Sequence, residues 1–146
     1  MAKQGRKKES GFTFVELMVV IFIIGLAATA VVLAIPDQGG SVQTEADRFA
    51  ARAKSLRDTA IIESRPAAIR LGPGGYSLSV RRAGAWTELG RFPWTSGTRA
   101  RLSGGEDGGT RFDSTGLAVP MRLQLERGER RVAVAIGHDG SVRVQR

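Results

Sequence analysis

The chain begins with a long run in which apolar residues follow one another without alternation. A basic start, MAKQGRKKESG at residues 1–11, precedes FTFVELMVVIFIIGLAATAVVLAI at residues 12–35. Residues 17–35 contain no charged side chain, and a helix of that length spans about 28 Å, close to the hydrocarbon thickness of a bilayer. The pattern predicts a membrane-spanning helix. Because its only positively charged flank is N-terminal, the rest of the chain is expected outside the cytoplasm.

A second helix is expected after an interruption at Ile35, Pro36 and two glycines. From about Ser41 onward the apolar positions recur at steps of three and four residues: Ala46, Phe49, Ala53, Leu56 and Ala60. This spacing predicts an amphipathic helix over residues 43–63 that packs one stripe onto a core. Ser64-Arg65-Pro66 ends it, since the residue before a proline is disfavoured in helical geometry.

Beyond residue 66 the pattern changes to short alternating runs separated by glycines, which is typical of β-strands. The expected strands cover residues 67–71, 76–81, 85–89, 98–102, 110–112, 121–125, 132–136 and 142–144. Asp139-Gly140 indicates a tight hairpin between the last two. An amphipathic helix followed by antiparallel strands predicts an α+β domain in which the helix covers one face of the sheet.

The amino-acid composition excludes several kinds of functional site. The chain has 146 residues, 22 Lys and Arg against 14 Asp and Glu, no cysteine and a single histidine, His138. Thiolate zinc sites, disulfides, cysteine nucleophiles and two-histidine metal sites are therefore excluded, and neither a cofactor nor an enzymatic activity is expected. His138 lies beside Asp139 and Ser141 in one hairpin, where a catalytic triad cannot converge, and is interpreted as an exposed turn residue.

Glu16 is the residue that an ordinary membrane anchor does not explain. A carboxylate inside a spanning segment costs about 2.5 to 3.5 kcal/mol on insertion scales. A cleavable secretory signal, with Ala28-Thr29-Ala30 as its small-residue site, accounts for the basic start and the apolar run but gives Glu16 no role. A glutamate that reaches the cytoplasmic interface stays open as the simpler interpretation.

Residues 8–17, KESGFTFVEL, resemble the class III signal of type IV pilins and type II secretion pseudopilins. The shared features are a short basic leader, Gly-Phe, and a Glu at the fifth position after the Gly. The resemblance implies that a prepilin peptidase cuts between Gly11 and Phe12 and methylates the new amine of Phe12. It also implies that Glu16 pairs with such an amine when a subunit enters a filament, since each charge alone is costly in apolar surroundings.

The C-terminal half narrows this resemblance to the GspH/FimT pseudopilin domain. Residues 112–116 have the Phe-x-x-x-Gly pattern of that domain, and residues 140–144 have its closing Gly-x-Val-x-Val pattern. No cluster of acidic residues resembles the calcium loop of the major secretion pseudopilins. The resemblance therefore implies a minor pseudopilin of a type II secretion system, similar to the H component.

The resemblance also implies how the chain is organised and what it meets. Residues 1–11 are expected to be a cleaved leader, 12–35 a transmembrane and assembly helix, 36–65 a hinge with the amphipathic helix, and 66–146 a periplasmic β-rich domain. Where the helix bends near Pro36 is left open. The implied partners are other pseudopilins, the prepilin peptidase and the bacterial inner membrane, which the chain is expected to cross once with a cytoplasmic N-terminus.

The excess of arginine keeps one alternative open, a FimT-like minor type IV pilin involved in pilus assembly or DNA uptake. The arginines considered for DNA contact lie near the C-terminus: Arg130, Arg131, Arg143 and Arg146. Glu126 and Glu129 are interspersed among them, which favours a solvated sheet edge over a continuous cationic stripe. Nucleic acid is therefore not the expected partner.

Four aromatic residues complete the set of candidate contacts: Tyr76, Trp86, Phe92 and Trp94. A platform for stacked bases would interleave such rings with cations on one strand face. The predicted strands do not place them so, and the four are interpreted as core or interface anchors.

Overall fold

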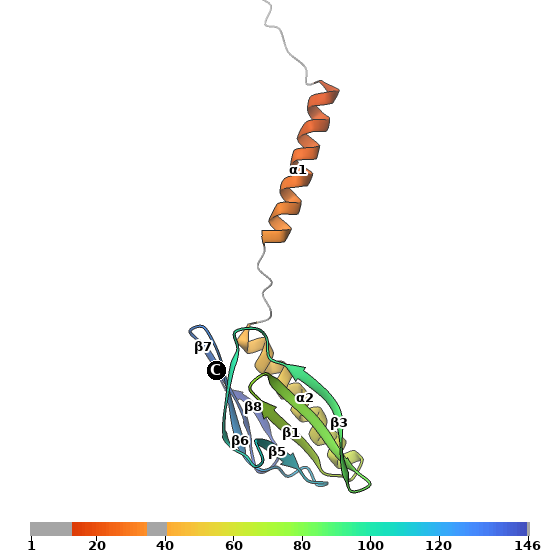
Figure 1. Cartoon of the computed structure of the whole chain (residues 1–146), viewed down its shortest axis with the longest axis vertical. Coiled ribbons are helices and arrows are strands. Elements are labelled where there is room, and N and C mark those ends of the chain that lie inside the picture. The colour runs from red at the N-terminus through yellow and green to blue at the C-terminus, as the bar shows by residue number, and fades with distance from the viewer. Residues whose placement is uncertain (1–12, 35–40, 146) are drawn as a thin grey trace, which may run out of the picture. The chain divides into compact units, whose positions relative to one another are not determined.

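The chain forms two compact units, Met1–Gln38 and Gly39–Arg146. A computed structural model describes residues 13–34 and 41–145 (Figure 1). The first unit holds helix α1 (Phe14–Ala34) and the second holds helix α2 (Val42–Ile62). The second unit also contains eight strands: β1 (Ala67–Gly72), β2 (Gly75–Arg82), β3 (Ala85–Pro93), β4 (Arg99–Gly104), β5 (Gly109–Phe112), β6 (Met121–Arg127), β7 (Arg130–Ile136) and β8 (Val142–Gln145).

Each predicted strand is present, and the strand ends differ from the expected ones by only a few residues. The α+β fold class is confirmed. The expected leader, the cleavage position between Gly11 and Phe12, the bend near Pro36 and Arg146 lie outside the described residues.

Helix α2 begins and ends where the sequence predicts. The Ser41 hydroxyl accepts a hydrogen bond from the Thr44 amide at 3.2 Å and caps the N-terminus. The helix ends at Ile62 with Glu63 as its C-cap, and Ser64 turns the chain away with a φ of 52°. The predicted apolar stripe is buried along its whole length: Ala46, Phe49, Ala53, Leu56 and Ala60.

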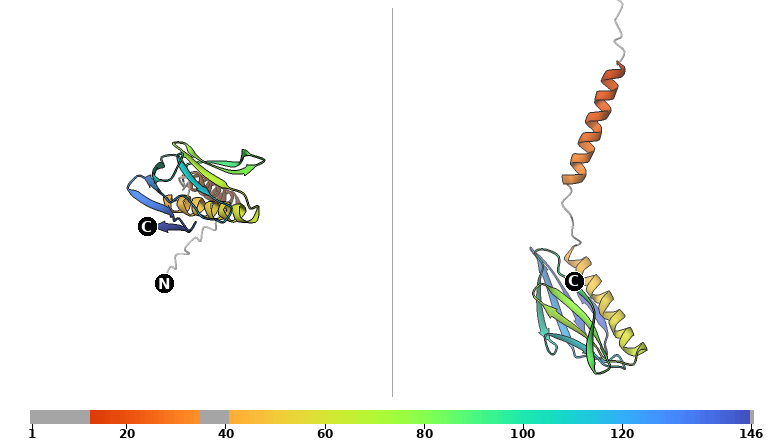
Figure 2. Two further views of the ribbon diagram at one scale, coloured as in Figure 1. Left: turned by 90° about the horizontal axis from the view of Figure 1, so that it is seen from below. Right: turned by 45° about the vertical axis from the view of Figure 1, so that its right-hand side comes forward.

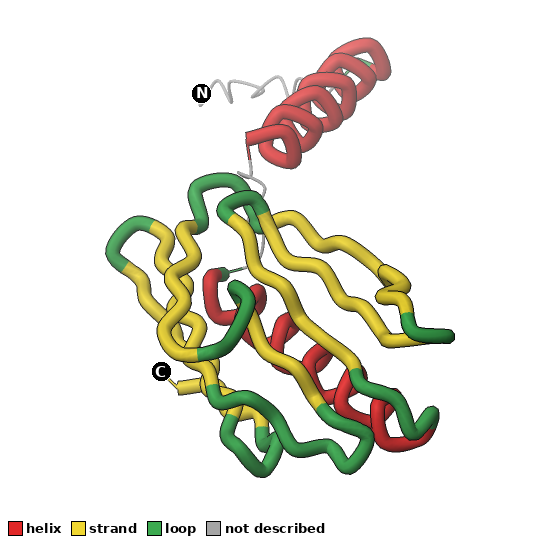
Figure 3. Tube along the Cα trace, turned by 60° about the horizontal axis from the view of Figure 1, so that its bottom comes forward, coloured by secondary structure: helices red, strands yellow, loops and turns green. Residues whose placement is uncertain are grey.

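The strands form two sheets rather than one. The first sheet has the order β3-β2-β1-β5 and the second has the order β4-β6-β7-β8, with antiparallel pairing throughout. Helix α2 packs against β1 of the first sheet and against β6, β7 and β8 of the second. Figures 2 and 3 show this helix beside both sets of strands. The expectation of a single sheet is therefore wrong, because alternation fixes where strands run but not which strands pair.

The core fills the space between α2 and the inner faces of the two sheets. Its largest fully buried side chains come from all three parts: Phe49 from α2; Ile69, Val80 and Phe112 from the first sheet; Leu123, Leu125, Val134 and Ile136 from the second. The ring of Phe49 meets Tyr76 edge-on with centroids 4.9 Å apart. The aromatic cluster therefore joins α2 to the first sheet, an arrangement that aromatic pairs prefer.

The first crossover between the sheets is held by the N-terminal turn of α2. The Glu45 carboxylate accepts hydrogen bonds from the Thr95 amide at 2.6 Å and from the Thr98 hydroxyl at 2.7 Å. Both residues lie between β3 and β4. A carboxylate in a first helical turn is also favoured by the helix dipole. One side chain thus stabilises both the helix start and the passage of the chain to the second sheet.

Arg57 on α2 joins two loops at the opposite end of the helix. Its Nε donates to the Gly116 carbonyl at 3.1 Å, and its Nη2 donates to the Asp139 carbonyl at 3.3 Å. The two glycines of the sequence patterns, Gly116 and Gly140, have φ values of 86° and 70° and lie against each other. A Cβ on Gly140 would overlap the Gly116 carbonyl oxygen. The two glycine patterns are therefore parts of one packed junction.

Candidate functional site

The described apolar side chains of the first unit are exposed, whereas the second unit has a buried apolar core. Every side chain described in α1, over residues 14–28, is exposed, with Phe14 at 75% and Phe22 at 70%. The exposed residues fall on all sides of the helix, without the polar face that a surface helix carries. Such a surface is stable in lipid or against other apolar helices.

Among the residues that the structure describes, none belongs to a helix long and apolar enough for a membrane crossing. The expected span at residues 12–35 includes positions outside the described ranges. Its transmembrane role stays a prediction.

Glu16 lies in the first turn of α1, where its backbone amide is bonded to the residue that precedes the helix. The Thr13 hydroxyl accepts a hydrogen bond from the Glu16 amide at 3.2 Å, and the Thr13 carbonyl accepts one from the Leu17 amide at 3.1 Å. Thr13 therefore caps the helix, and Glu16 occupies the third helical position of a Thr-x-x-Glu capping-box sequence. A carboxylate at this position is also favoured by the helix dipole.

The Thr-x-x-Glu pattern of residues 13–16 is a signal of a helix start in the sequence itself. This position does not exclude pairing with an amine, because the Glu16 carboxylate keeps its negative charge. The pairing of Glu16 with a Phe12 amine stays a prediction, since Phe12 lies outside the described residues.

The arginines considered for DNA contact do not form one cluster. Arg131 and Arg143 are exposed on the outer face of the second sheet, where Arg131 pairs with Glu126 at 3.4 Å. Arg130 neighbours Arg127 at the start of β7, and Arg143 lies opposite Ala135 near its end. With about 3.4 Å per residue, these ends are well over 10 Å apart.

The strand register instead reveals a wider cationic surface on that sheet. We call it the second-sheet face, defined by the exposed arginines that point away from α2: Arg99, Arg101, Arg122, Arg131 and Arg143. Of the residues that share this face in β4, β6, β7 and β8, only Glu126 is acidic. Arg99 and Arg101 come from a strand distant in sequence, so sequence reasoning missed them.

The hairpin around His138 serves the fold. His138 is exposed in the turn, as predicted, and its Nδ1 lies 3.2 Å from the Ala118 carbonyl oxygen. The Asp139 carboxylate accepts a hydrogen bond from the Ser141 amide at 3.0 Å. Hydrogen bonding from Ser141, first from its hydroxyl, holds the pKa of Asp139 below its usual value. Residues 13–34 and 41–145 contain no group of three His, Asp or Glu side chains suited to a metal ion.

Known proteins resemble parts of this chain in sequence. Residues 6–32 match the prokaryotic N-terminal methylation motif. The chain is 30% identical over 80 residues to the type II secretion system protein H of Aeromonas hydrophila and 28% identical over 79 residues to that of Klebsiella michiganensis. Each alignment covers 53% of this chain but only 44% and 43% of the relatives. The chain therefore spans less than half the length of these relatives.

Solved structures resemble the folded unit. The minor pseudopilin EpsH from the type 2 secretion system of Vibrio cholerae aligns with a TM-score of 0.64 at 16% identity, over 73% of this chain and 97% of that one. The type IV minor pilin FimU of Pseudomonas aeruginosa aligns with a TM-score of 0.59 at 15% identity, over 72% and 88%.

The folded unit has a pilin-like fold, and residues 6–32 carry an N-terminal methylation motif. In sequence and in fold the chain resembles the GspH-type minor pseudopilins, as the sequence patterns predict.

Proposed function

We propose that the chain is a minor pseudopilin of a type II secretion system, equivalent to the H component. The observation that carries this proposal is the presence in one chain of the methylation motif at residues 6–32 and of an EpsH-like domain. Its role is mechanical. The subunit joins a periplasmic filament that drives protein export across the outer membrane, and it catalyses no reaction.

The proposed processing, anchoring and assembly of the subunit all depend on α1. Prepilin peptidase removes residues 1–11 and methylates Phe12, and α1 holds the protein in the inner membrane with the domain in the periplasm. Because α1 is apolar on all sides, it can exchange lipid contacts for contacts with neighbouring subunit helices. Glu16 then pairs with the Phe12 amine of a neighbour, which sets the register of the filament.

Processing gives the first test. The full chain is expressed with and without the prepilin peptidase of a type II secretion system, and the intact mass of the membrane-extracted protein is measured. We expect a product that begins at Phe12 and carries one added methyl group. Gly11→Leu serves as the matched control and keeps its leader, since a bulky side chain blocks the cleavage position.

Two results would overturn the proposal. One is a chain that keeps residues 1–11 when the peptidase is present. The other is a product that begins at Val31, which would point to a secretory signal cut after Ala30.

One observation favours a second function, that of a FimT-like minor type IV pilin that takes up DNA. The second-sheet face carries five exposed arginines and a single carboxylate, and guanidinium groups bind phosphates well. Binding of duplex DNA to the full chain is measured between about 50 and 200 mM salt, where phosphate contacts weaken steeply. Arg101→Ala is expected to reduce the slope of log affinity against log salt concentration by about one. Lack of affinity at the lowest salt removes this function.

A further inference from the structure

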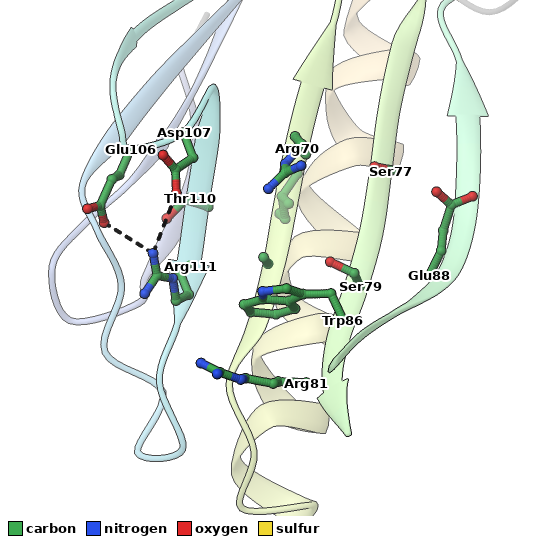
Figure 4. Close-up of a pocket in the computed structure, with 12 residues that line it drawn as sticks. Arg70, Ser77, Ser79, Arg81, Trp86, Glu88, Glu106, Asp107, Thr110 and Arg111 are labelled. Carbon is green, nitrogen blue, oxygen red and sulfur yellow. Dashed lines mark hydrogen bonds and ion pairs between the residues drawn. The ribbon is translucent and has the colours of Figure 1, made fainter. Parts of the chain in front are cut away.

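A trough of about 400 Å³ lies on the outer face of the first sheet, on the side opposite the core (Figure 4). Its floor consists of small side chains on β1 and β2: Ala68, Ser77 and Ser79. The strand register places Ser79 opposite Ala68 on β1 and opposite Glu88 on β3. Neighbouring large side chains therefore stand above this floor and form the walls.

The walls carry cations at the two ends of the trough. Arg70 on β1 lies opposite Ser77, and Arg81 lies four residues beyond Ser77 on β2, opposite Trp86. Along a strand this spacing is about 14 Å. Figure 4 shows the Trp86 indole between the side chains of Arg70 and Arg81. Trp86 is 42% exposed, so an apolar surface is open to solvent between two positive charges.

These two guanidinium groups differ from Arg111 on the neighbouring strand β5. The Arg111 guanidinium forms ion pairs with Glu106 at 3.5 Å and with Asp107 at 3.8 Å. Among residues 13–34 and 41–145, the guanidinium groups of Arg70 and Arg81 have no ion-pair or hydrogen-bond partner. A pair of free arginines that flank an exposed tryptophan is suited to a ligand with two anionic groups around an apolar one.

We propose that this trough binds an extended polypeptide segment of a partner protein that carries two acidic side chains on either side of an aromatic one. In an extended chain, residues i and i+4 point to the same side about 14 Å apart, with residue i+2 midway between them. The strand register gives Arg70 and Arg81 this spacing, and Figure 4 shows the Trp86 indole between their side chains. The two carboxylates meet the guanidinium groups, and the aromatic ring packs on the indole.

The charges along the sides favour a polypeptide over a nucleic acid. Glu88 lines one side of the trough, and Glu106 and Asp107 line the other. A nucleic acid carries a charge on every residue and would bring phosphates close to these carboxylates. An acidic–aromatic–acidic peptide places its charges only at the cationic ends. The second-sheet face lacks these carboxylates on both sides, so the two surfaces select different ligands.

The probe is the capped peptide Glu-Ser-Phe-Ser-Glu, with Gln-Ser-Phe-Ser-Gln as its uncharged counterpart. The full ¹⁵N-labelled chain in detergent micelles has two indole N–H signals, because it contains two tryptophans. Trp94 is buried and donates to the Gly72 carbonyl at 3.2 Å, so its signal is an internal reference. We expect a saturable shift of the Trp86 signal with the acidic peptide, an unchanged Trp94 signal, and at least tenfold weaker binding of the uncharged peptide.

Variants locate the binding. Arg70→Ala and Arg81→Ala are each expected to weaken binding of the acidic peptide about tenfold, since each removes a charge-assisted hydrogen bond. Arg101→Ala, on the second-sheet face, is the matched control and leaves the affinity unchanged. This test does not depend on α1 or on filament assembly, so it can fail while the proposed function stands.

Four results would overturn the proposal. They are no shift at millimolar acidic peptide, equal binding of the two peptides, equal affinity for free glutarate, and displacement of the peptide from Trp86 by a single-stranded oligonucleotide that binds more tightly. The third result would leave a small-anion site, and the fourth a nucleic-acid site.

Discussion

Helices α1 and α2 have the same length, 21 residues each, but their apolar side chains differ in burial. The apolar residues of α2 form one stripe, and the strands of its own domain bury that stripe. The described side chains of α1 are exposed around the whole helix. The periodicity of apolar residues therefore separates a helix that its own domain buries from a helix whose described side chains stay exposed.

Two phenylalanines make this comparison measurable. Phe49 on α2 is 1% exposed and packs on Tyr76, whereas Phe22 on α1 is 70% exposed. Phe49→Ala is expected to lower the free energy of unfolding of the domain by about 3 to 5 kcal/mol, because it leaves a cavity in the core. Chemical denaturation of the full chain in micelles, followed by Trp94 fluorescence, gives the value.

Phe22→Ala is the matched control and should leave that unfolding transition unchanged. An equal loss of stability in both variants would contradict the division into a domain with its own core and a helix whose apolar side chains lie outside that core.

The next largest effect is expected at the junction between the two glycine patterns. Gly140→Ala places a Cβ against the Gly116 carbonyl oxygen and against Arg57, at a φ of 70°. We expect a loss of about 2 to 4 kcal/mol from overpacking and backbone strain together. Gly128→Ala is the control, with a φ of 58° and open space around its Cβ.

Gly128→Ala should cost only the backbone strain, about 1 kcal/mol. Thermal unfolding of both variants measures the difference. Similar melting temperatures would show that the close contact between the two loops does not stabilise the domain.

The smallest effect is a pH dependence from Asp113, in the turn after β5. A hydrogen bond from the Thr115 hydroxyl, followed by those from backbone amides, holds the pKa of this carboxyl below its usual value. Its contribution to stability is therefore present above the unfolded-state pKa, near 4, and is lost as the pH falls through the folded value. Asp113→Ala should destabilise the domain at pH 7 but progressively less in acid.

Denaturation curves at a series of pH values test this dependence. Ser114→Ala changes the same turn without altering the Asp113 carboxylate and should keep the wild-type pH profile. A difference between wild type and Asp113→Ala that does not shrink in acid would assign the effect of Asp113 to packing rather than to charge.

Much of the fold could be predicted because its signals are local. The stripe of α2, the Ser41 start and the Pro66 boundary each depend on neighbouring residues, and they appear where expected. The division into two sheets could not be predicted from alternation, since pairing depends on crossovers. Glu45 fixes one crossover from 50 residues away, by its bond to the Thr95 amide.

The burial of the aromatic residues was also only partly predictable from the sequence. Tyr76 and Trp94 are buried as predicted, while Trp86 is 42% exposed on β3. Trp86 lies opposite Arg81 on the outer face of β3, whereas Trp94 follows the end of β3 and packs on Phe49 and Tyr76. Arg70, Trp86 and Arg81 likewise form one surface only through strand register.

For the candidate site, the sequence predicts the residues but not the full role of Glu16. The Thr13-x-x-Glu16 capping box offers a reason for the carboxylate that needs no second subunit. Three variants separate the two roles. Glu16→Gln keeps a capping-box side chain but removes the charge, Glu16→Ala removes both, and Thr13→Ala removes the hydroxyl cap alone.

The most direct test of the central claim is the fraction of each variant that enters filaments, measured in sheared pseudopili from cells with an active secretion system. If the Glu16 charge neutralises a neighbour's amine, Glu16→Gln and Glu16→Ala are both processed and membrane-bound but absent from filaments, while Thr13→Ala is incorporated. Wild-type incorporation of Glu16→Gln together with loss of Thr13→Ala would contradict this claim, because Glu16 would then act only as a cap of its own helix.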